Sequence, residues 1–198
     1  MNKKILIIVL CAIIGMFIYA GLSQNNSIIE EENEDVKLLT ESYKTEFIVY
    51  GSQLNFDNGC YVRYIDEITK EALTPDSTYV YKVLVINNLD ETVNFEEDMV
   101  NIIKEEMNNN QLSVYYTGVD AAPFIDSGIF SHLIIGNLRK EYILLGMTHE
   151  FSNASKPTAF NWAWEDTDYE DYKKGNHTYI VNTIIMEAAF NVKKFFGE

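Results

Sequence analysis

The sequence predicts an α/β fold, a small layered sheet of four to five parallel or mixed strands with helices on both faces, preceded by one N-terminal transmembrane helix. Three observations lead to this prediction. Short runs rich in β-branched and aromatic residues alternate with segments of helical periodicity. One run, Val83–Ile86, is apolar at every position, as expected of a strand buried on both faces. The first 22 residues contain a long apolar stretch without a charge.

The N-terminal stretch is the strongest single signal. Lys3 and Lys4 precede Ile5–Leu22, 18 residues without a charge, which as a helix would be about 27 Å long and would match the bilayer core. We therefore expect residues 1–22 to be an uncleaved, single-pass anchor in the cell membrane. Because positive residues stay on the cytoplasmic side, the N-terminus should lie inside and the globular domain outside. The alternative is a signal peptide cleaved near Gly21-Leu22-Ser23, which would give a secreted protein.

The composition of the rest of the chain indicates its domain limits and restricts its partners. Residues 23–44 are polar and acidic and are expected to form a tether, and residues 45–198 a single globular domain. Beyond the N-terminal segment there are 13 basic and 30 acidic residues, a net charge of −17. Such a domain repels phosphates, so we expect no nucleic acid partner, and its own charge also opposes anionic lipid headgroups. Cys11 lies in the apolar stretch, so Cys60 has no disulfide partner and is expected to be a small buried hydrophobe.

The first half of the domain alternates strands and helices. Glu46–Gly51 and Tyr79–Asn87 are predicted strands, and the second of these contains the apolar run. Between them, residues 61–72 are predicted to be a helix that ends before Pro75. A further helix follows Asn94, because apolar residues recur at helical spacing. The apolar positions of these two helices are Tyr61, Tyr64, Ile65, Ile68 and Ala72, and Phe95, Met99, Ile102, Ile103 and Met107.

The second half continues the alternation. Leu112–Gly118 and Tyr142–Met147 are predicted strands, and residues 129–138 fit either a short helix or a strand. Phe160, Trp162 and Trp164 alternate, which indicates an extended segment with one packed face. The last helix has one apolar face, formed by Ile180, Ile184, Ala188, Val192 and Phe195, with Val181 and Ile185 widening it.

Polar residues follow several of these strands, at the edge where open α/β sheets bind ligands. They are Asp90, Asp120, His149 and Glu150. If these loops share one edge, His149 would be a general base and an aspartate would orient it or bind a metal with it, as in a hydrolase. The competing interpretation is that strand ends collect polar residues because loops meet water and helices need caps.

A second group of acidic residues suggests a cation. Asp166, Asp168 and Glu170 alternate in a loop-like stretch. The stretch is not an EF-hand, because that loop would need Gly at Asp171 and Glu at His177. An irregular divalent cation site at these three carboxylates is the hypothesis. No other cofactor is expected.

The leading functional hypothesis is a membrane-anchored extracytoplasmic module that binds an unknown ligand or protein and has no reaction of its own. The sequence contains neither a Gly-x-Ser-x-Gly elbow nor a phosphate-binding glycine loop with lysine. One alternative is a surface hydrolase, metal-assisted or not, that uses Asp90, Asp120, His149 and Glu150. The other is a subunit of a membrane complex that the anchor helps to assemble.

Overall fold

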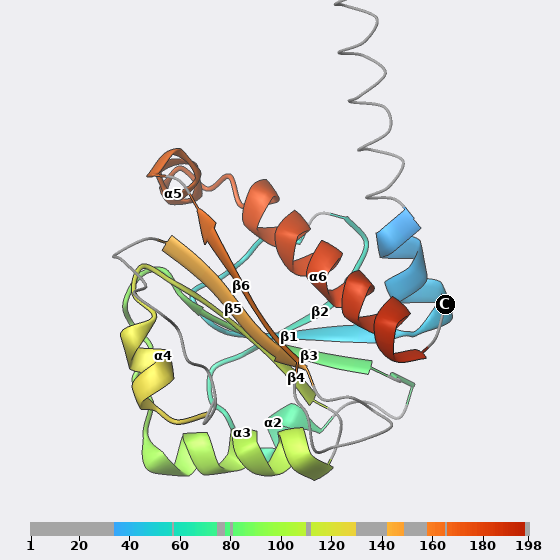
Figure 1. Ribbon diagram of the computed structural model, residues 1–198, viewed down its shortest axis with the longest axis horizontal. Helices are drawn as coiled ribbons and strands as arrows, with labels where there is room; N and C mark the ends of the chain where they lie inside the picture. Colours follow the sequence, from blue (N-terminus) through green and yellow to red (C-terminus); the bar gives the residue numbers. More distant parts are fainter. Residues whose placement is uncertain are drawn as a thin grey trace, which may run out of the picture. The chain divides into compact units, whose positions relative to one another are not determined.

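The computed structural model describes residues 34–56, 58–74, 78–79, 81–109, 112–129, 142–148, 158–164 and 166–196, and of 142–148 and 158–164 it describes the backbone. The folded unit that carries the sheet spans Val36–Glu198. Its elements, in chain order, are η1 (Leu38–Ser42, a turn of π-helix), β1 (Thr45–Gly51), β2 (Tyr61–Ile65), α2 (Lys70–Leu73), β3 (Tyr81–Asn88), α3 (Glu97–Asn109), β4 (Leu112–Gly118), α4 (Ala122–Asp126), β5 (Tyr142–Thr148), β6 (Thr158–Trp164), α5 (Asp166–Lys173) and α6 (Thr178–Phe196) (Figure 1).

The described strands form one mixed sheet in the order β2-β1-β3-β4-β5-β6. Strands β2, β1, β3 and β4 are parallel, which confirms the predicted α/β class. β5 runs antiparallel to β4, so that Met147 lies beside Val114 and Ile143 beside Gly118, and β6 is antiparallel to β5. Among the described residues the sheet has six strands rather than four or five, because it includes β2, predicted to be helical, and β6, which holds the alternating aromatic residues.

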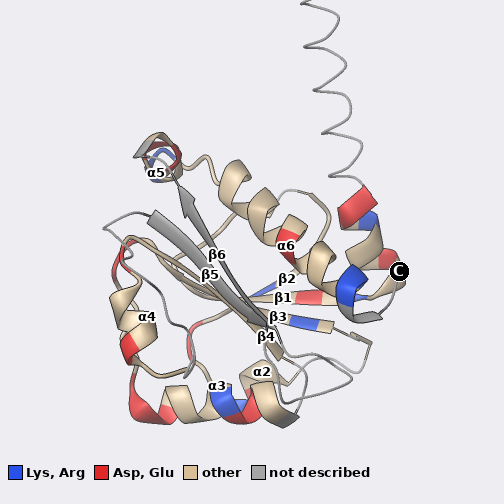
Figure 2. Ribbon diagram, in the orientation of Figure 1, with Lys and Arg blue, Asp and Glu red and all other residues tan. Residues whose placement is uncertain are grey.

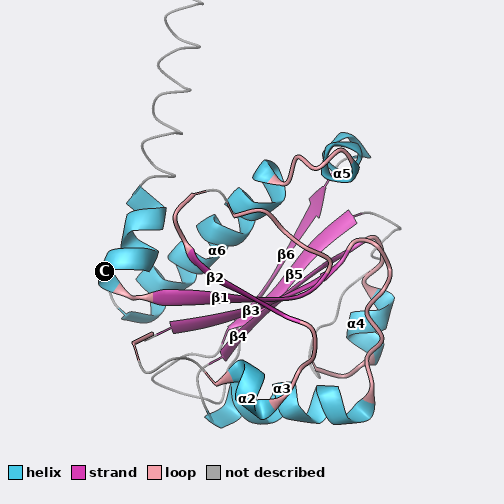
Figure 3. Ribbon diagram, turned by 180° about the vertical axis from the view of Figure 1, so that it is seen from behind, coloured by secondary structure: helices cyan, strands magenta, loops and turns pink. Residues whose placement is uncertain are grey.

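Helices cover both faces of the sheet. On one face, α6 packs on alternate strand residues such as Phe47, Val83 and Tyr115, and η1 and α5 adjoin it. On the other face, α2, α3 and α4 pack on the intervening residues, among them Ile48 and Leu84. The views from the two sides agree on these layers (Figures 1 and 3). Every residue of β3 is buried, as the unbroken apolar run predicts for a central strand.

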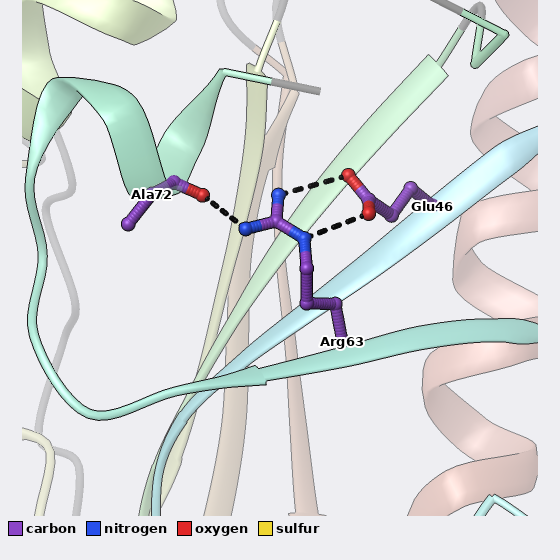
Figure 4. A network of polar contacts seen from close by, with 3 residues as sticks. All are labelled: Glu46, Arg63 and Ala72. Atoms are coloured by element: carbon purple, nitrogen blue, oxygen red, sulfur yellow. Dashed lines mark hydrogen bonds and ion pairs between the residues drawn. The ribbon is translucent and has the colours of Figure 1, made fainter. Parts of the chain in front are cut away.

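The predicted helix over residues 61–72 is wrong, since the first part is strand β2 and only α2 is helical. Tyr61 and Tyr64, which the helical pattern placed inside, are 45% and 47% exposed. The segment pairs its backbone in parallel with β1, and Arg63 adds two hydrogen bonds of 2.9 and 3.1 Å to the buried Glu46 of that strand. Arg63 also donates to the Ala72 carbonyl oxygen at 2.7 Å, which ties β2 to α2 (Figure 4). Long-range pairing thus overrides the local helical pattern.

The folded unit begins at Val36, before the boundary at residue 45 that the composition indicates. Leu39 in η1 is fully buried in the core under α6, so the end of the expected tether belongs to the domain. The expected anchor, residues 1–22, and most of the ambiguous segment 129–138 lie outside the described residues. Within the part that is described, no helix is long and apolar enough to cross a membrane.

Candidate functional site

The strand order reverses direction between β1 and β3. From β1 the chain moves outward to β2, and from β3 it continues the other way to β4. The β1–β2 connection packs on the α6 side through Leu54 and Phe56, whereas α3, in the β3–β4 connection, covers the opposite face. Diverging connections leave a crevice at the carboxyl ends of two such strands, where α/β sheets bind their ligands. Here those ends are Gly51-Ser52 and Asn87-Asn88.

A pocket of about 270 Å³ opens at this point. It is lined by Tyr50, Gly51, Ser52, Ile65, Asp66, Thr92 and Val93. The residues come from the ends of β1 and β2 and from the loop after β3, so three carboxyl ends supply its walls. Tyr50, Ile65 and Val93 also pack against the core on the α3 side. The pocket therefore has an apolar base on that side, while one carboxylate and three hydroxyls, those of Tyr50, Ser52 and Thr92, are its polar side-chain groups.

Asn87 joins the ends of β1 and β3. The Ser52 amide donates to the Asn87 carbonyl oxygen at 3.0 Å, and Asn87 Nδ2 donates to the Ser52 carbonyl oxygen at 2.9 Å. Asn87 Nδ2 also donates to the Tyr172 hydroxyl at 3.3 Å, and its Oδ1 accepts from the Leu89 amide at 3.3 Å. Both ends of this fully buried amide are thereby satisfied, which fixes the pocket wall at Ser52.

A polar and aromatic cluster occupies the α6 side of the same edge. The Tyr172 hydroxyl of α5 donates to Asp90 Oδ2 at 3.2 Å. The ring of His177 stacks on Tyr172 with centroids 4.7 Å apart, and His177 Nδ1 accepts from the Asn55 amide at 3.0 Å. That hydrogen bond puts the proton of a neutral imidazole on Nε2. His177 thus joins α5 and α6 to the β1–β2 loop.

The Tyr172 phenol is held in its neutral form. Burial raises its pKa above the usual value, hydrogen bonds from Asn87 and Ser52 partly offset the rise, and the nearby Asp90 charge adds to it. A phenol with a raised pKa is a hydrogen-bond donor and a poor base at neutral pH. Tyr172 can therefore position Asp90 and cannot readily take up a proton.

Asp120 lies at the same edge, after β4, but its hydrogen bonds hold the start of α4 and not the pocket. Its Oδ1 accepts from the Ala122 amide at 2.9 Å at the start of α4, and its carbonyl oxygen accepts from the Tyr116 hydroxyl at 2.8 Å. Asn88 Nδ2 donates to the same hydroxyl at 3.2 Å. Asp90 and Asp120 thus follow neighbouring strands, and each has its own partners. The capping interpretation accounts for Asp120.

His149 and Glu150 lie outside the described residues. The strand before them, β5, is antiparallel to β4, so its carboxyl end is at the opposite edge from Asp90 and Asp120. The expectation that these loops share one edge assumed a parallel strand, and for β5 that assumption is wrong. A catalytic role for His149 and Glu150 stays a prediction.

The three proposed metal ligands lie in or at the start of α5 rather than in an extended loop. On a helix, Asp168 is rotated by about 200° from Asp166, whereas Glu170 is one turn away. Glu170 forms an ion pair with Lys173. Among the side chains that the structure describes, no group of three or more His, Cys, Asp or Glu residues is placed to hold a metal ion.

Four members of this edge, namely Asp66, Thr92, Tyr172 and His177, were not predicted from the sequence. Asp66 could have been found, because it directly follows β2 and would have been nominated with Asp90 had residues 61–65 been taken as a strand. Tyr172 and His177 reach the edge through β6 and α5, so no local signal marks them. Comparisons of this chain with protein-family models, with curated proteins and with solved structures found no match.

Proposed function

We propose that this protein is a membrane-anchored, extracytoplasmic binding module that holds a small polar ligand in the pocket at the carboxyl ends of β1, β2 and β3. The observation that carries the proposal is the position of the pocket. It lies where the strand order reverses, and Ser52, Asp66 and Thr92 offer polar groups around an apolar base.

The contacts around the pocket favour binding over catalysis. Asp120 caps α4, His177 Nδ1 accepts from a backbone amide, and Tyr172 is a neutral donor. A general base needs a nitrogen or oxygen directed at a reacting proton. These groups instead direct their atoms at the protein itself, as expected for a rigid, preformed binding site.

The charge of the site indicates the ligand class. Asp66 is the one charged side chain among the pocket residues, and the domain carries a net charge of −17 beyond the N-terminal segment. Both favour a cation and disfavour an anion. Because residues with hydroxyl groups also line the pocket, the ligand that fits best is a small molecule with an ammonium group and further hydrogen-bonding groups.

Membrane attachment is supported by the sequence alone. Ile5–Leu22 contains no charge and has the length of a membrane span, and Lys3 and Lys4 precede it. The proposal places the folded unit outside the cell. Protease treatment of intact cells tests this placement, because an external domain is digested whereas an internal one is protected.

Ligand binding can be tested with three probes of similar size, namely ethanolamine (a cation), ethylene glycol (neutral) and glycolate (an anion). The full chain in lipid nanodiscs would be titrated with each, and backbone amide shifts followed by NMR. We expect ethanolamine to shift the amides of Ser52, Asp66 and Thr92 with millimolar affinity, since a ligand of four heavy atoms gains only about 4 kcal/mol. Glycolate should cause no shift at these positions.

A matched pair of variants provides the control. Asp66→Asn should weaken ethanolamine binding about tenfold, the equivalent of 1.4 kcal/mol. Glu67→Gln removes the same charge from the next residue, which is exposed and does not line the pocket, so it should leave binding unchanged. Equal effects of the two variants, or equal responses to all three probes, would refute the proposed site.

A further inference from the structure

The outward side of α6 carries a row of exposed apolar side chains. Tyr179, Met186 and Phe190 are 50%, 40% and 58% exposed. Their spacing of seven and four residues places them on one side of the helix, opposite the buried Ile180 and Ile184. We call the surface formed by Tyr179, Met186, Phe190 and the exposed Lys193 the outer face of α6. Single exposed apolar residues are normal on a protein surface, whereas three large ones in one row indicate a surface that contacts something else.

The charge of α6 differs from that of the rest of the domain. Glu187 is its one acidic residue, and that side chain is only 9% exposed. Lys193 and Lys194 are exposed in its last turn. Figure 2 shows the helix almost free of charged residues apart from these. In a domain with a net charge of −17 beyond the N-terminal segment, this helix presents an apolar surface with a basic end.

The chain enters the folded unit beside this helix. Val36 begins the unit, and η1, which follows directly, lies against α6 near its C-terminal end (Figures 1 and 3). Only the 13 residues Ser23–Asp35 separate the unit from the expected anchor, and fully extended they reach about 45 Å. A unit on so short a tether has a high effective concentration at the bilayer, so a weak contact is enough to hold it there.

We propose that the outer face of α6 rests on the surface of the membrane that holds residues 5–22. This inference rests on the proposed anchoring. Helices with an apolar row and lysines lie in the plane of the bilayer interface, where aromatic rings are enriched. Since the net charge of the domain opposes anionic lipids, the apolar side chains supply the contact. A second copy of the chain is the competing occupant, and the charge of each unit opposes it.

The orientation has a consequence for the candidate site. The pocket draws its apolar base from the core on the α3 side of the sheet, whereas α6 covers the other side. With α6 on the membrane, the α3 side faces the aqueous phase, and a soluble ligand can enter the pocket without crossing the bilayer surface.

The experiment uses site-directed spin labels on the full chain in a Cys11→Ser, Cys60→Ala background. Single cysteines replace Met186 or Phe190, both exposed, and Asp98→Cys on the exposed side of α3 is the control. The chains are reconstituted in phosphatidylcholine vesicles, with and without phosphatidylglycerol. Collision rates with oxygen, which enriches in lipid, and with a water-soluble nickel chelate report the depth of each label. We expect the ratio of oxygen to nickel collisions to be at least fivefold higher at 186 and 190 than at 98.

The outcomes separate the inference from the proposed function. The vesicles are also washed with alkaline carbonate and centrifuged, which separates peripheral from anchored chains. Release of the chain into the supernatant would overturn the anchoring, and this inference with it. Retention of the chain with equal ratios at all three positions would overturn the inference and leave the anchoring intact. Spin–spin broadening between labels at 186, with low oxygen and nickel access, would show a second copy on this face and overturn membrane contact. Because a label can perturb its site, Tyr179→Cys gives a third position, where the same high ratio is expected.

Discussion

Gly51 lies so close to Asn87 that a Cβ atom added to it would be 2.3 Å from the Asn87 carbonyl oxygen. The two residues pair at the carboxyl ends of β1 and β3. Gly51 also has a φ of +91°, in the region that residues with side chains avoid. A glycine is therefore needed here for two reasons, and both arise where the pocket opens.

Gly51→Ala should destabilise the domain by about 3 kcal/mol, since the left-handed backbone costs about 1–2 kcal/mol and the contact with a backbone oxygen adds a similar amount. Gly59→Ala is the matched control, because Gly59 has a φ of +85° and no atom within 4 Å of an added Cβ. Gly59→Ala should therefore lose only the stability that the left-handed backbone costs a residue with a side chain. Thermal unfolding measures the difference, at about 2–4 °C per kcal/mol for a domain of this size. Equal losses in the two variants would show that the close contact with Asn87 has no energetic effect.

Arg63→Met should also destabilise the domain, because it leaves the carboxylate of Glu46, only 6% exposed, without its two hydrogen bonds from the guanidinium. We expect a loss of about 2 kcal/mol in urea unfolding, less than for a fully buried pair since Arg63 is 35% exposed. The control is Lys70→Met, which removes the exposed pair with Glu105 and should cost much less, because both charges of that pair stay hydrated. A loss for Arg63→Met no larger than the control would contradict the role assigned to this pair.

Two buried tyrosines should make the domain sensitive to alkali. Burial raises the pKa of Tyr81 to about 12 and that of Tyr115 well above 10. In the unfolded chain both titrate near 10, so above that pH the folded state binds more protons than the unfolded state. The contribution of the two protonated phenols to the free energy of unfolding is complete below about pH 10 and is lost as the pH rises toward 12. The free energy of unfolding, measured with urea at several pH values, should fall steadily over this interval.

The variants Tyr81→Phe and Tyr179→Phe separate this effect from the titration of surface groups. Tyr81→Phe removes a buried phenol that is hydrogen-bonded to Ser113 at 2.8 Å, and should flatten the decline between pH 10 and 12. Tyr179 is 50% exposed, so Tyr179→Phe should leave the slope unchanged. The same slope in both variants and in the parent would show that Tyr81 does not titrate as its burial requires.

Cys60 should react slowly as a nucleophile. Burial raises the pKa of its thiol from 9.0 to about 12, so at pH 8 the thiolate is about a thousandfold rarer than for an ordinary cysteine. In a Cys11→Ser variant, Ellman's reagent should react with the native chain about a thousandfold more slowly than with the chain unfolded in urea. Native and unfolded rates within tenfold of each other would contradict a half-buried, protonated thiol.

Much of the fold could be predicted from short-range patterns. The central strand β3 is apolar at consecutive positions, and the apolar residues of α3 and α6 recur at helical spacing, so each element follows from its own residues. The segment around Arg63 shows the limit of this approach. Its aromatic and apolar residues fit a helix as well as a strand, and the choice depends on pairing with β1, whose Glu46 lies 17 positions before Arg63.

The candidate site was only partly predictable for the same reason. Asp90 follows a strand whose direction the alternating pattern indicates, and it does lie at the carboxyl edge. The strand before His149 could be recognised from its apolar residues, but its direction could not. Apolar residues bury equally well in a parallel or an antiparallel strand, so periodicity carries no information about direction.

The sequence alone determined the α/β class, the acidic character of the domain, the apolar N-terminal segment and most of the buried apolar residues of β3, α3 and α6. These depend on periodicity and composition, which act over a few neighbouring residues. Only the tertiary structure decided that β2 is a strand, that β5 is antiparallel, and that Ser52, Asp66 and Thr92 line one pocket. Each of these depends on hydrogen bonds or packing between residues that are distant in the chain. A pattern read from a few neighbouring residues carries no information about such contacts.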